Sequence, residues 1–197
     1  KGDATPATDE GHTPASYKAN SDTKAIDAAG LKPVAVDLAR FDAITDKAAL
    51  SKVLGEQVRA DVDPLNATDF TTENLFGVFV TQGLATPGEV IPYMLQGGLG
   101  LPEREYYLSA DPKMASIRTA YQAYIAKLLT AAGSAHAAVE AKRIYDLEVQ
   151  IAKAHATREQ SEDFTKSASV WTKEDFAKKA PGMDWSAFFG AAKLDGA

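Results

Sequence analysis

Two consecutive stretches in the second half of the chain carry apolar residues at helical spacing, and they constrain the fold more than any other feature. Asp111-Pro112 is an N-cap followed by proline at the first helical position, and Gly133 ends the first pattern. Its apolar positions are Met114, Ile117, Tyr121, Tyr124, Ile125, Leu128 and Leu129. Ser134 caps the second stretch, whose stripe is Ile144, Leu147, Ile151 and Ala154 and which extends to about Arg158. The tight connection predicts an antiparallel helical hairpin.

Capping and breaking residues predict shorter helices on both sides of this hairpin. Residues 17–29 have a weak helical pattern that Gly30 ends, and Pro33 begins a helix over residues 34–43 with Val34, Leu38 and Phe41 or Ala35 on one face. Asp46 caps a helix that extends to about residue 60, with a stripe of Leu50, Val53, Leu54, Gln57 and Val58.

The C-terminal residues predict two more short helices. Thr172 and Asp175 resemble a capping box for a helix that Pro181 ends, and Asp184 caps a last helix that carries Trp185, Phe188 and Phe189. The polar residues 159–170 between them and the long hairpin are predicted to form a loop.

Residues 75–96 have a different period. The segment LFGVFVTQ alternates Phe76, Val78 and Val80 with Leu75 and Phe79, and GLATPG is typical of a turn before EVIPYMLQ alternates again. A β-hairpin is therefore predicted, with Pro92 restricting its second strand to an edge or an irregular position. The fold class is mainly α, with a long antiparallel helical hairpin and one small β-hairpin.

Composition limits the classes of function. The chain has 197 residues, no cysteine, a net charge of −6 and a pI near 5.1. The lack of cysteine excludes thiol catalysis, disulfides and cysteine-ligated zinc, and the acidity argues against nucleic-acid binding. No apolar run is long enough to span a bilayer and the N-terminus has no signal-peptide core, while residues 1–13 are predicted to be a flexible lead-in.

The histidines do not form a recognisable metal motif. His12, His136 and His155 are too far apart for HExxH, and His155 with Glu159 gives two potential ligands one helical turn apart without a third. An exposed pair without metal is the favoured interpretation. Ser134 lies two residues before His136, but a capping role is commoner for such a serine than a catalytic triad.

The acidic residues favour structural roles. Glu103 and Glu105 flank Arg104, and Glu159, Glu162 and Asp163 cluster in a polar segment typical of a solvated surface. Glu148 lies beside the apolar stripe of its helix, so it needs a partner, and Arg104 or Arg118 are the candidates. The GGLG segment follows no clear strand–helix unit and is a weak phosphate-loop signal.

Several motifs in order resemble the neprilysin-like (endothelin-converting-enzyme-type) zinc metallopeptidases. They are SYKANSDTKAIDAAGLKPVAVDLARFDAI, the hairpin LFGVFV…EVIPYMLQ, QGGLGLPEREYYL, MASIRTAYQAYIAKLLTAAG, AKRIYDLEVQIAKAH and APGMDWSAFF. Together they cover about residues 14–193. The sequence departs from the family near Ala156, where a tryptophan is usual, and near Glu162, where an arginine is usual.

The resemblance implies that residues 14–197 are part of a helical lid domain that faces a catalytic domain and gates the access of small peptides. The zinc motifs of such enzymes lie in a C-terminal part that these residues do not include, so no catalytic, cofactor-binding or metal-binding residue is assigned and the chain alone is expected to be inactive. Structural roles are assigned to Gly97, Gly98, Gly100, Pro102, Arg104, Tyr106, Tyr107, Glu148 and Trp185. The corner GGLGLPEREYYL is expected to be a scaffold, with direct peptide contact as the alternative.

The resemblance further implies zinc in the intact enzyme, the C-terminal catalytic domain and peptides as partners, and an extracytoplasmic location. The absence of cysteine suits a bacterial version. A second hypothesis is a stand-alone domain that binds a peptide or protein without hydrolysis. An exposed aromatic patch at Trp185, Phe188 and Phe189 would favour that hypothesis. An unrelated helical enzyme is the remaining alternative.

Overall fold

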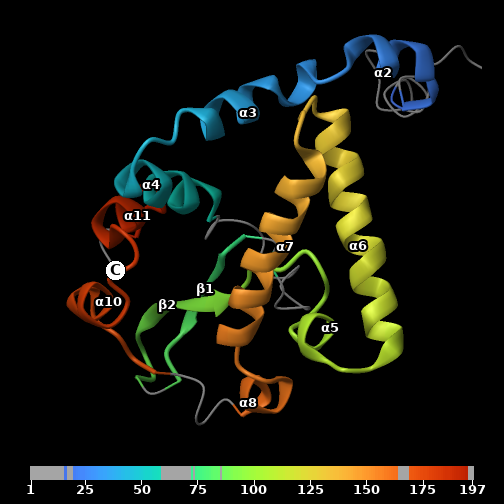
Figure 1. Ribbon diagram of the computed structural model, residues 1–197. Coiled ribbons are helices and arrows are strands. Elements are labelled where there is room, and N and C mark those ends of the chain that lie inside the picture. The colour runs from blue at the N-terminus through green and yellow to red at the C-terminus, as the bar shows by residue number, and fades with distance from the viewer. Residues whose placement is uncertain are drawn as a thin grey trace, which may run out of the picture. The chain divides into compact units, whose positions relative to one another are not determined.

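The computed structural model describes residues 16, 20–58, 72, 74–84, 86–163 and 169–194 (Figure 1). The chain divides into two compact units, Lys1–Ile44 and Thr45–Ala197. The predicted lead-in at residues 1–13 lies outside the described residues. Among the described helices, none is long and apolar enough to cross a membrane.

The described part of the first unit includes three short helical segments. Helix α2 (Thr23–Ala29) is capped by Asp22, whose side chain accepts a hydrogen bond from the Ala25 amide at 3.0 Å, and it ends at Gly30 with φ of 52°. A 3-10 helix, η1 (Lys32–Val34), contains Pro33 and leads into α3 (Ala35–Asp42). Pro33 was expected at the start of an α-helix; it instead precedes α3 in the tighter turn, which its fixed φ also suits.

In the second unit, α4 (Lys47–Gln57) packs against α11 (Trp185–Ala191). The cap at Asp46 is confirmed, since its carboxylate accepts from the Ala49 amide at 2.8 Å. The expected stripe was wrong in part, because Leu50 is 43% exposed whereas Ser51 and Gly55 are buried. A side chain at Gly55 would overlap the backbone carbonyl of Phe188, so small residues on this face let the two helices approach closely.

Helix α4 also ends earlier than predicted. The expected end was near residue 60, but the backbone is already extended at Val58, whose side chain is buried. Val58 belongs to an apolar cluster that is otherwise formed by α11 and the residues directly after it. The buried members are Val58, Trp185, Phe188, Phe189, Ala192 and Leu194. Tertiary burial of Val58 therefore overrides the helical pattern there.

The predicted β-hairpin is confirmed. Strands β1 (Phe76–Gln82) and β2 (Val90–Gln96) pair antiparallel, with Phe76 opposite Gln96 and Val80 opposite Pro92. Phe76, Val78 and Met94 pack against the aromatic cluster of α11, which gives this face of the sheet its apolar cover. Within the described residues the sheet has two strands, so Pro92 lies on an edge strand as expected.

The long helical hairpin is also confirmed. Helices α6 (Pro112–Ala131) and α7 (Ala137–Ala154) run side by side and antiparallel, and α5 (Glu105–Leu108) packs against both (Figure 1). Asp111 caps α6, and Gly133 has φ of 88° after its last turn. This positive φ is the conformation that a glycine adopts without strain.

Two details of this region differ from expectation. Helix α7 begins after His136 without a side-chain cap on its backbone. Ser134 instead donates to Glu140 at 2.6 Å. The stripe is shifted, because Leu147 is 62% exposed whereas Ala141 and Ala152 are buried. Small alanines on the packed face bring the helices together and turn the larger Leu147 outward.

The expected loop at residues 159–170 begins instead as helix α8 (Arg158–Glu162), which is separate from α7 and starts with a capping box at Thr157 and Gln160. Helix α10 (Lys173–Lys179) has the predicted capping box at Thr172 and Asp175. Asp184 caps α11 as predicted, by accepting from the Ala187 amide at 3.0 Å.

Candidate functional site

The corner GGLGLPEREYYL lies between β2 and α6, where α5 contacts both long helices. Gly98 has φ of 81°, a conformation that favours glycine. Gly100 lies against the hydroxyl of Tyr121, and a Cβ at this position would overlap that oxygen. Gly97 is buried beside the backbone carbonyl of Asn74. The corner therefore needs glycine for a turn at one position and for close approach at the other two.

A carboxylate and two tyrosine hydroxyls hold the corner to the helical hairpin. Tyr107 of α5 donates to Glu148 Oε2 at 2.6 Å, and Tyr121 of α6 donates to Glu148 Oε1 at 2.9 Å. The Tyr107 oxygen also accepts from the Leu101 amide at 2.9 Å. One side chain of α7 thus joins α5, α6 and the glycine loop. We call Tyr107, Tyr121 and Glu148 the tyrosine–glutamate brace.

The partner predicted for Glu148 was wrong. Arg104 and Arg118 were the candidates, but the hydrogen bonds of Glu148 come from the two tyrosines. Arg118 donates to the backbone oxygens of Tyr106 and Ser109, both at 3.0 Å. Hydroxyl donors satisfy a half-buried carboxylate, which leaves Arg118 to satisfy the carbonyls at the end of α5.

Burial shapes the electrostatics of the brace. Tyr107 is only 5% exposed, and desolvation, followed by its hydrogen bond to Glu148, raises its pKa well above the ordinary range. The same two causes raise the pKa of Tyr121. Both hydroxyls therefore keep their protons at neutral pH and act as donors to the carboxylate.

Aromatic packing fixes the ring of Tyr107. Its ring stacks on Tyr145 of α7 with centroids 5.9 Å apart and an interplanar angle of 27°, and it meets Tyr121 edge-on at 6.5 Å. Such offset and edge-on pairs are the favoured geometries of aromatic rings. The neighbouring Tyr106 is half-buried, and Pro102 is exposed at the start of the turn into α5.

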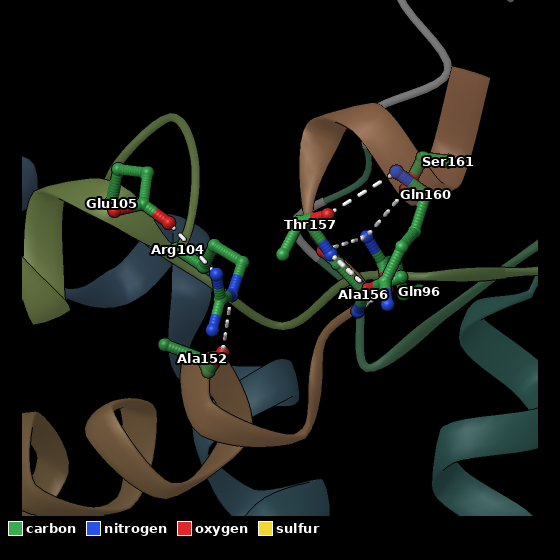
Figure 2. Close-up of polar contacts among 8 residues, drawn as sticks. All are labelled: Gln96, Arg104, Glu105, Ala152, Ala156, Thr157, Gln160 and Ser161. Carbon is green, nitrogen blue, oxygen red and sulfur yellow. Dashed lines mark hydrogen bonds and ion pairs between the residues drawn. The ribbon is translucent and has the colours of Figure 1, made fainter. Parts of the chain in front are cut away.

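Gln96, just before the corner, and Arg104, within it, bond to the C-terminal part of α7 and to α8 (Figure 2). Arg104 Nε donates to the Ala152 carbonyl at 3.3 Å, and its guanidinium pairs with Glu105 at 2.8 Å. The Gln96 side chain accepts from the Ala156 amide at 2.8 Å. It also donates to the Ala156 carbonyl and to the Ser161 hydroxyl, both at 3.5 Å.

His155 adds a further link and does not form a metal site with Glu159. Its Nε2 lies 2.9 Å from the Gly97 carbonyl, whereas Glu159 is exposed on α8. In the part of the chain that the structure describes, no three His, Cys, Asp or Glu side chains gather to hold a metal ion. These residues therefore do not fit a zinc ion.

Trp185, the remaining site residue predicted from the sequence, lies apart from the brace in the α11 cluster. It is 7% exposed and its indole N–H donates to the Ala180 carbonyl at 2.6 Å. The sequence pattern did not identify Tyr121 and Gln96 as polar anchors. Tyr121 was identified only as an apolar position, although its hydroxyl needs a partner when buried, and that need was the available signal.

The brace and its flanking bonds can fix a backbone corner against three helices. Within the described residues, the brace offers its carboxylate only to hydroxyl donors already bonded to it. We therefore assign it a structural capacity and no reaction.

Comparisons with known proteins place this architecture in a family. The model of the N-terminal part of peptidase family M13 matches residues 1–196. The crystal structure of the Mycobacterium tuberculosis zinc metalloprotease Zmp1 in complex with an inhibitor has a TM-score of 0.75 and 26% identity over 96% of this chain. The cryo-EM structure of Zmp1 in an open state has a TM-score of 0.72 and 26% identity over 86% of this chain.

The chain spans 28% of the first Zmp1 chain and 25% of the second, so it corresponds to less than a third of those proteins. A partially open state of M. tuberculosis Zmp1 matches with a TM-score of 0.53, at 25% identity over 87% of this chain and 24% of that one. The ordered motifs, the helical fold and the family match agree, and the chain belongs to the N-terminal domain of peptidase family M13, the neprilysin-like metallopeptidases.

Proposed function

We propose that this chain is the non-catalytic helical part of an M13 zinc metalloendopeptidase and that it gates the access of small peptides to a catalytic cavity. The observation that carries the proposal is the family match over residues 1–196. Zinc and the groups that activate water come from a C-terminal catalytic domain, which we propose as the partner of residues 14–197. No catalytic step is assigned to residues of this chain.

The brace supports a gating role because a wall that excludes large substrates has to be rigid. Tyr107, Tyr121 and Glu148 join three helices around one half-buried carboxylate. Arg104 and Gln96 attach the same corner to α7 and α8. Packed polar networks of this kind have one low-energy arrangement. A corner held in this way keeps its shape when a peptide enters, so size discrimination is maintained.

The alternative is a stand-alone domain that binds a peptide or protein without hydrolysis. An exposed aromatic patch at Trp185, Phe188 and Phe189 would have favoured it. These side chains are 7%, 0% and 8% exposed, so the patch is part of the core. This observation weakens the alternative, and gating remains the better supported function.

The test uses the polypeptide encoded by the complete reading frame that contains this segment. We expect zinc-dependent cleavage of an internally quenched short peptide and slow cleavage of the same sequence within a long unfolded protein. The 197-residue chain alone should cleave neither. Hydrolysis by the chain alone, or a reading frame without a zinc motif, would overturn the proposal.

A substitution in the brace tests whether its rigidity is needed to exclude long substrates. Glu148→Gln removes the charge that both tyrosines bind and should raise the cleavage of the long substrate relative to the short one. Glu159→Gln removes a charge from an exposed position on α8 and serves as the matched control. An unchanged substrate ratio in the folded Glu148→Gln protein would argue against a gating role for the brace.

We also propose that the protein works outside the cytosol, on the family resemblance alone. Fractionation of the native host cells, with detection by an antibody against this chain, tests the proposal. A signal confined to the cytosolic fraction would reject it.

A further inference from the structure

An apolar groove of about 670 Å³ lies away from the brace, between strand β2 and the segment that leads into α10. Figure 1 shows α10 beside the β1–β2 hairpin. One wall is formed by Leu84 and by four consecutive residues, 91–94. The opposite wall includes Val170, Trp171 and Phe176. Because side chains of a strand alternate between its faces, a groove lined by four consecutive residues runs along the edge of β2.

The strand register shows which backbone groups face this groove. The Gly83 amide donates to the Glu89 carbonyl at 2.8 Å, and the two residues continue the register in which Val80 lies opposite Pro92. Hydrogen-bonded and non-hydrogen-bonded pairs alternate along an antiparallel ladder. The Val80–Pro92 pair is therefore non-hydrogen-bonded, and the backbone groups of Pro92 and Met94 point away from β1.

In the described residues, no hydrogen bond joins the Met94 amide or the carbonyls of Pro92 and Met94 to a group outside the hairpin. Buried backbone groups normally find a partner, and an edge strand presents them to another chain. The groove thus combines apolar walls with a row of backbone acceptors and one donor.

Aromatic contacts join the side chains of the far wall. Trp171 and Phe176 have ring centroids 5.0 Å apart, and Phe176 meets Phe189 edge-on at 5.2 Å. The Lys179 ammonium lies 5.0 Å from the centre of the Trp171 ring. Lys179 also forms an ion pair with Asp175, which lies on the same helix, α10. Even so, Trp171 is 38% exposed, Leu84 62% and Val170 74%, so apolar surface remains open along the groove.

We propose that this groove binds an extended apolar peptide, which adds as a strand along the outer edge of β2 with alternate side chains against Trp171 and Phe176. Strand addition satisfies the Pro92 and Met94 backbone groups, which an apolar small molecule or a lipid chain leaves unpaired. The inference rests on the proposed function for the source of the ligand, a peptide on its way to the catalytic domain. The groove then acts as a peptide-binding site of the helical domain.

Pro92 sets the strength of this site. Its missing N–H removes one donor from the centre of the edge, so a peptide carbonyl opposite it gains no hydrogen bond. The edge of β2 therefore pairs weakly with another strand, which limits aggregation through this edge. Replacing Pro92 by valine adds the missing N–H toward the groove without touching the β1–β2 bonds, and should strengthen peptide binding.

The test measures fluorescence anisotropy of a fluorescein-labelled peptide, Lys-Thr-Val-Phe-Val-Thr-Lys, with the 197-residue chain and without zinc. We expect saturable binding that Leu84→Asp or Val170→Asp weakens at least about tenfold, since each places a charge on one wall of the groove. The matched control is Leu147→Asp on α7, where the leucine is also 62% exposed but lies outside the groove. It should leave the affinity unchanged.

Two further arms test backbone pairing. Pro92→Val should tighten binding about two- to tenfold, the range of one added hydrogen bond. The same peptide with its alternate amides N-methylated should bind at least about tenfold more weakly, because it cannot form a strand ladder. Circular dichroism checks that each variant is folded. If an aspartate variant does not fold, the Pro92→Val variant still tests the proposal.

Several results would overturn the inference. They are no saturable binding of the peptide, equal binding of the N-methylated peptide, or equal affinity of the two groove variants and the control. Sedimentation that shows self-association through the groove would make a second copy its occupant and would also reject the proposal. None of these outcomes depends on hydrolysis, so they leave the proposed gating function to be judged by its own assay.

Discussion

Tyr107 donates a hydrogen bond of 2.6 Å to Glu148, a residue 41 positions later in the chain. The same tyrosine oxygen accepts from the Leu101 amide, so one hydroxyl joins the glycine loop to the middle of α7. Tyr121 completes the arrangement from α6. A single carboxylate on α7 therefore links α5, α6 and the corner, and loss of its partners should lower the stability of the fold.

Replacing Tyr107 by phenylalanine should lower the free energy of unfolding by about 1.5–3 kcal/mol, the range for a hydrogen bond to a charged group. The ring keeps its packing on Tyr145, but the Leu101 amide and one oxygen of Glu148 lose their partner. Urea denaturation followed by circular dichroism measures the change. Tyr124→Phe is the control, since this tyrosine is 57% exposed, and it should change stability by less than about 0.5 kcal/mol. Equal effects of the two substitutions would show that the brace contributes nothing.

Gly100→Ala should destabilise the second unit by about 1–3 kcal/mol, the usual range for overpacking. The added methyl group would overlap the Tyr121 hydroxyl and force it away from Glu148. At Gly182, by contrast, a Cβ meets no atom within 4 Å, so Gly182→Ala should be neutral or slightly stabilising. Thermal unfolding of both variants decides the matter, and a neutral Gly100→Ala would mean that the corner can move away from α6.

High pH should weaken the brace. The pKa of both Tyr107 and Tyr121 is raised above the ordinary value of 10.0, so the folded chain holds these protons more tightly than the unfolded chain. Their contribution to stability is complete below pH 10.0 and decreases as the pH rises above it. Urea midpoints measured across this range should fall with pH, and Tyr107→Phe and Tyr121→Phe should each make the slope shallower. A slope that neither substitution alters would assign the effect to other groups.

Gln96→Ala should loosen the start of α8 without unfolding the hairpin. The substitution removes the acceptor of the Ala156 amide and the donor to Ser161, both at the junction of α7 and α8 (Figure 2). Hydrogen exchange should become faster at Ala156 and in α8 but remain unchanged in β1. Gln82→Ala, an exposed glutamine at the other end of the sheet, is the matched control. Unchanged exchange at Ala156 would show that Gln96 does not hold this junction.

Local chemistry made several elements predictable from the sequence. Asp46, Asp111, Thr172 and Asp184 cap the helices that follow them, because a short polar side chain satisfies amides only two or three residues away. Gly30 and Gly133 have positive φ at helix ends, where glycine is the usual residue. The alternating pattern of residues 75–96 likewise gave the hairpin, since strand faces follow directly from the order of residues.

Contacts between distant residues were not predictable in the same way. The pattern placed Leu50 and Leu147 on packed faces, but both are exposed, whereas Ser51, Gly55, Ala141 and Ala152 are buried. Small residues permit close contact between helices. Which face of a helix is buried therefore depends on the helix that packs against it, and that helix can be distant in the sequence. The sequence pattern also assigned arginine to Glu148, whereas tyrosines from α5 and α6 satisfy it.

The sequence by itself determined the helical class, the hairpin, the caps and, through ordered motifs, the M13 family. These features depend on neighbours in the chain or on the order of motifs along it. Only the tertiary structure decided that Tyr107, Tyr121 and Glu148 form one brace and that the edge of β2 borders an apolar groove. Both arrangements bring together residues from separate elements, and their geometry is set by packing of whole helices and strands against one another.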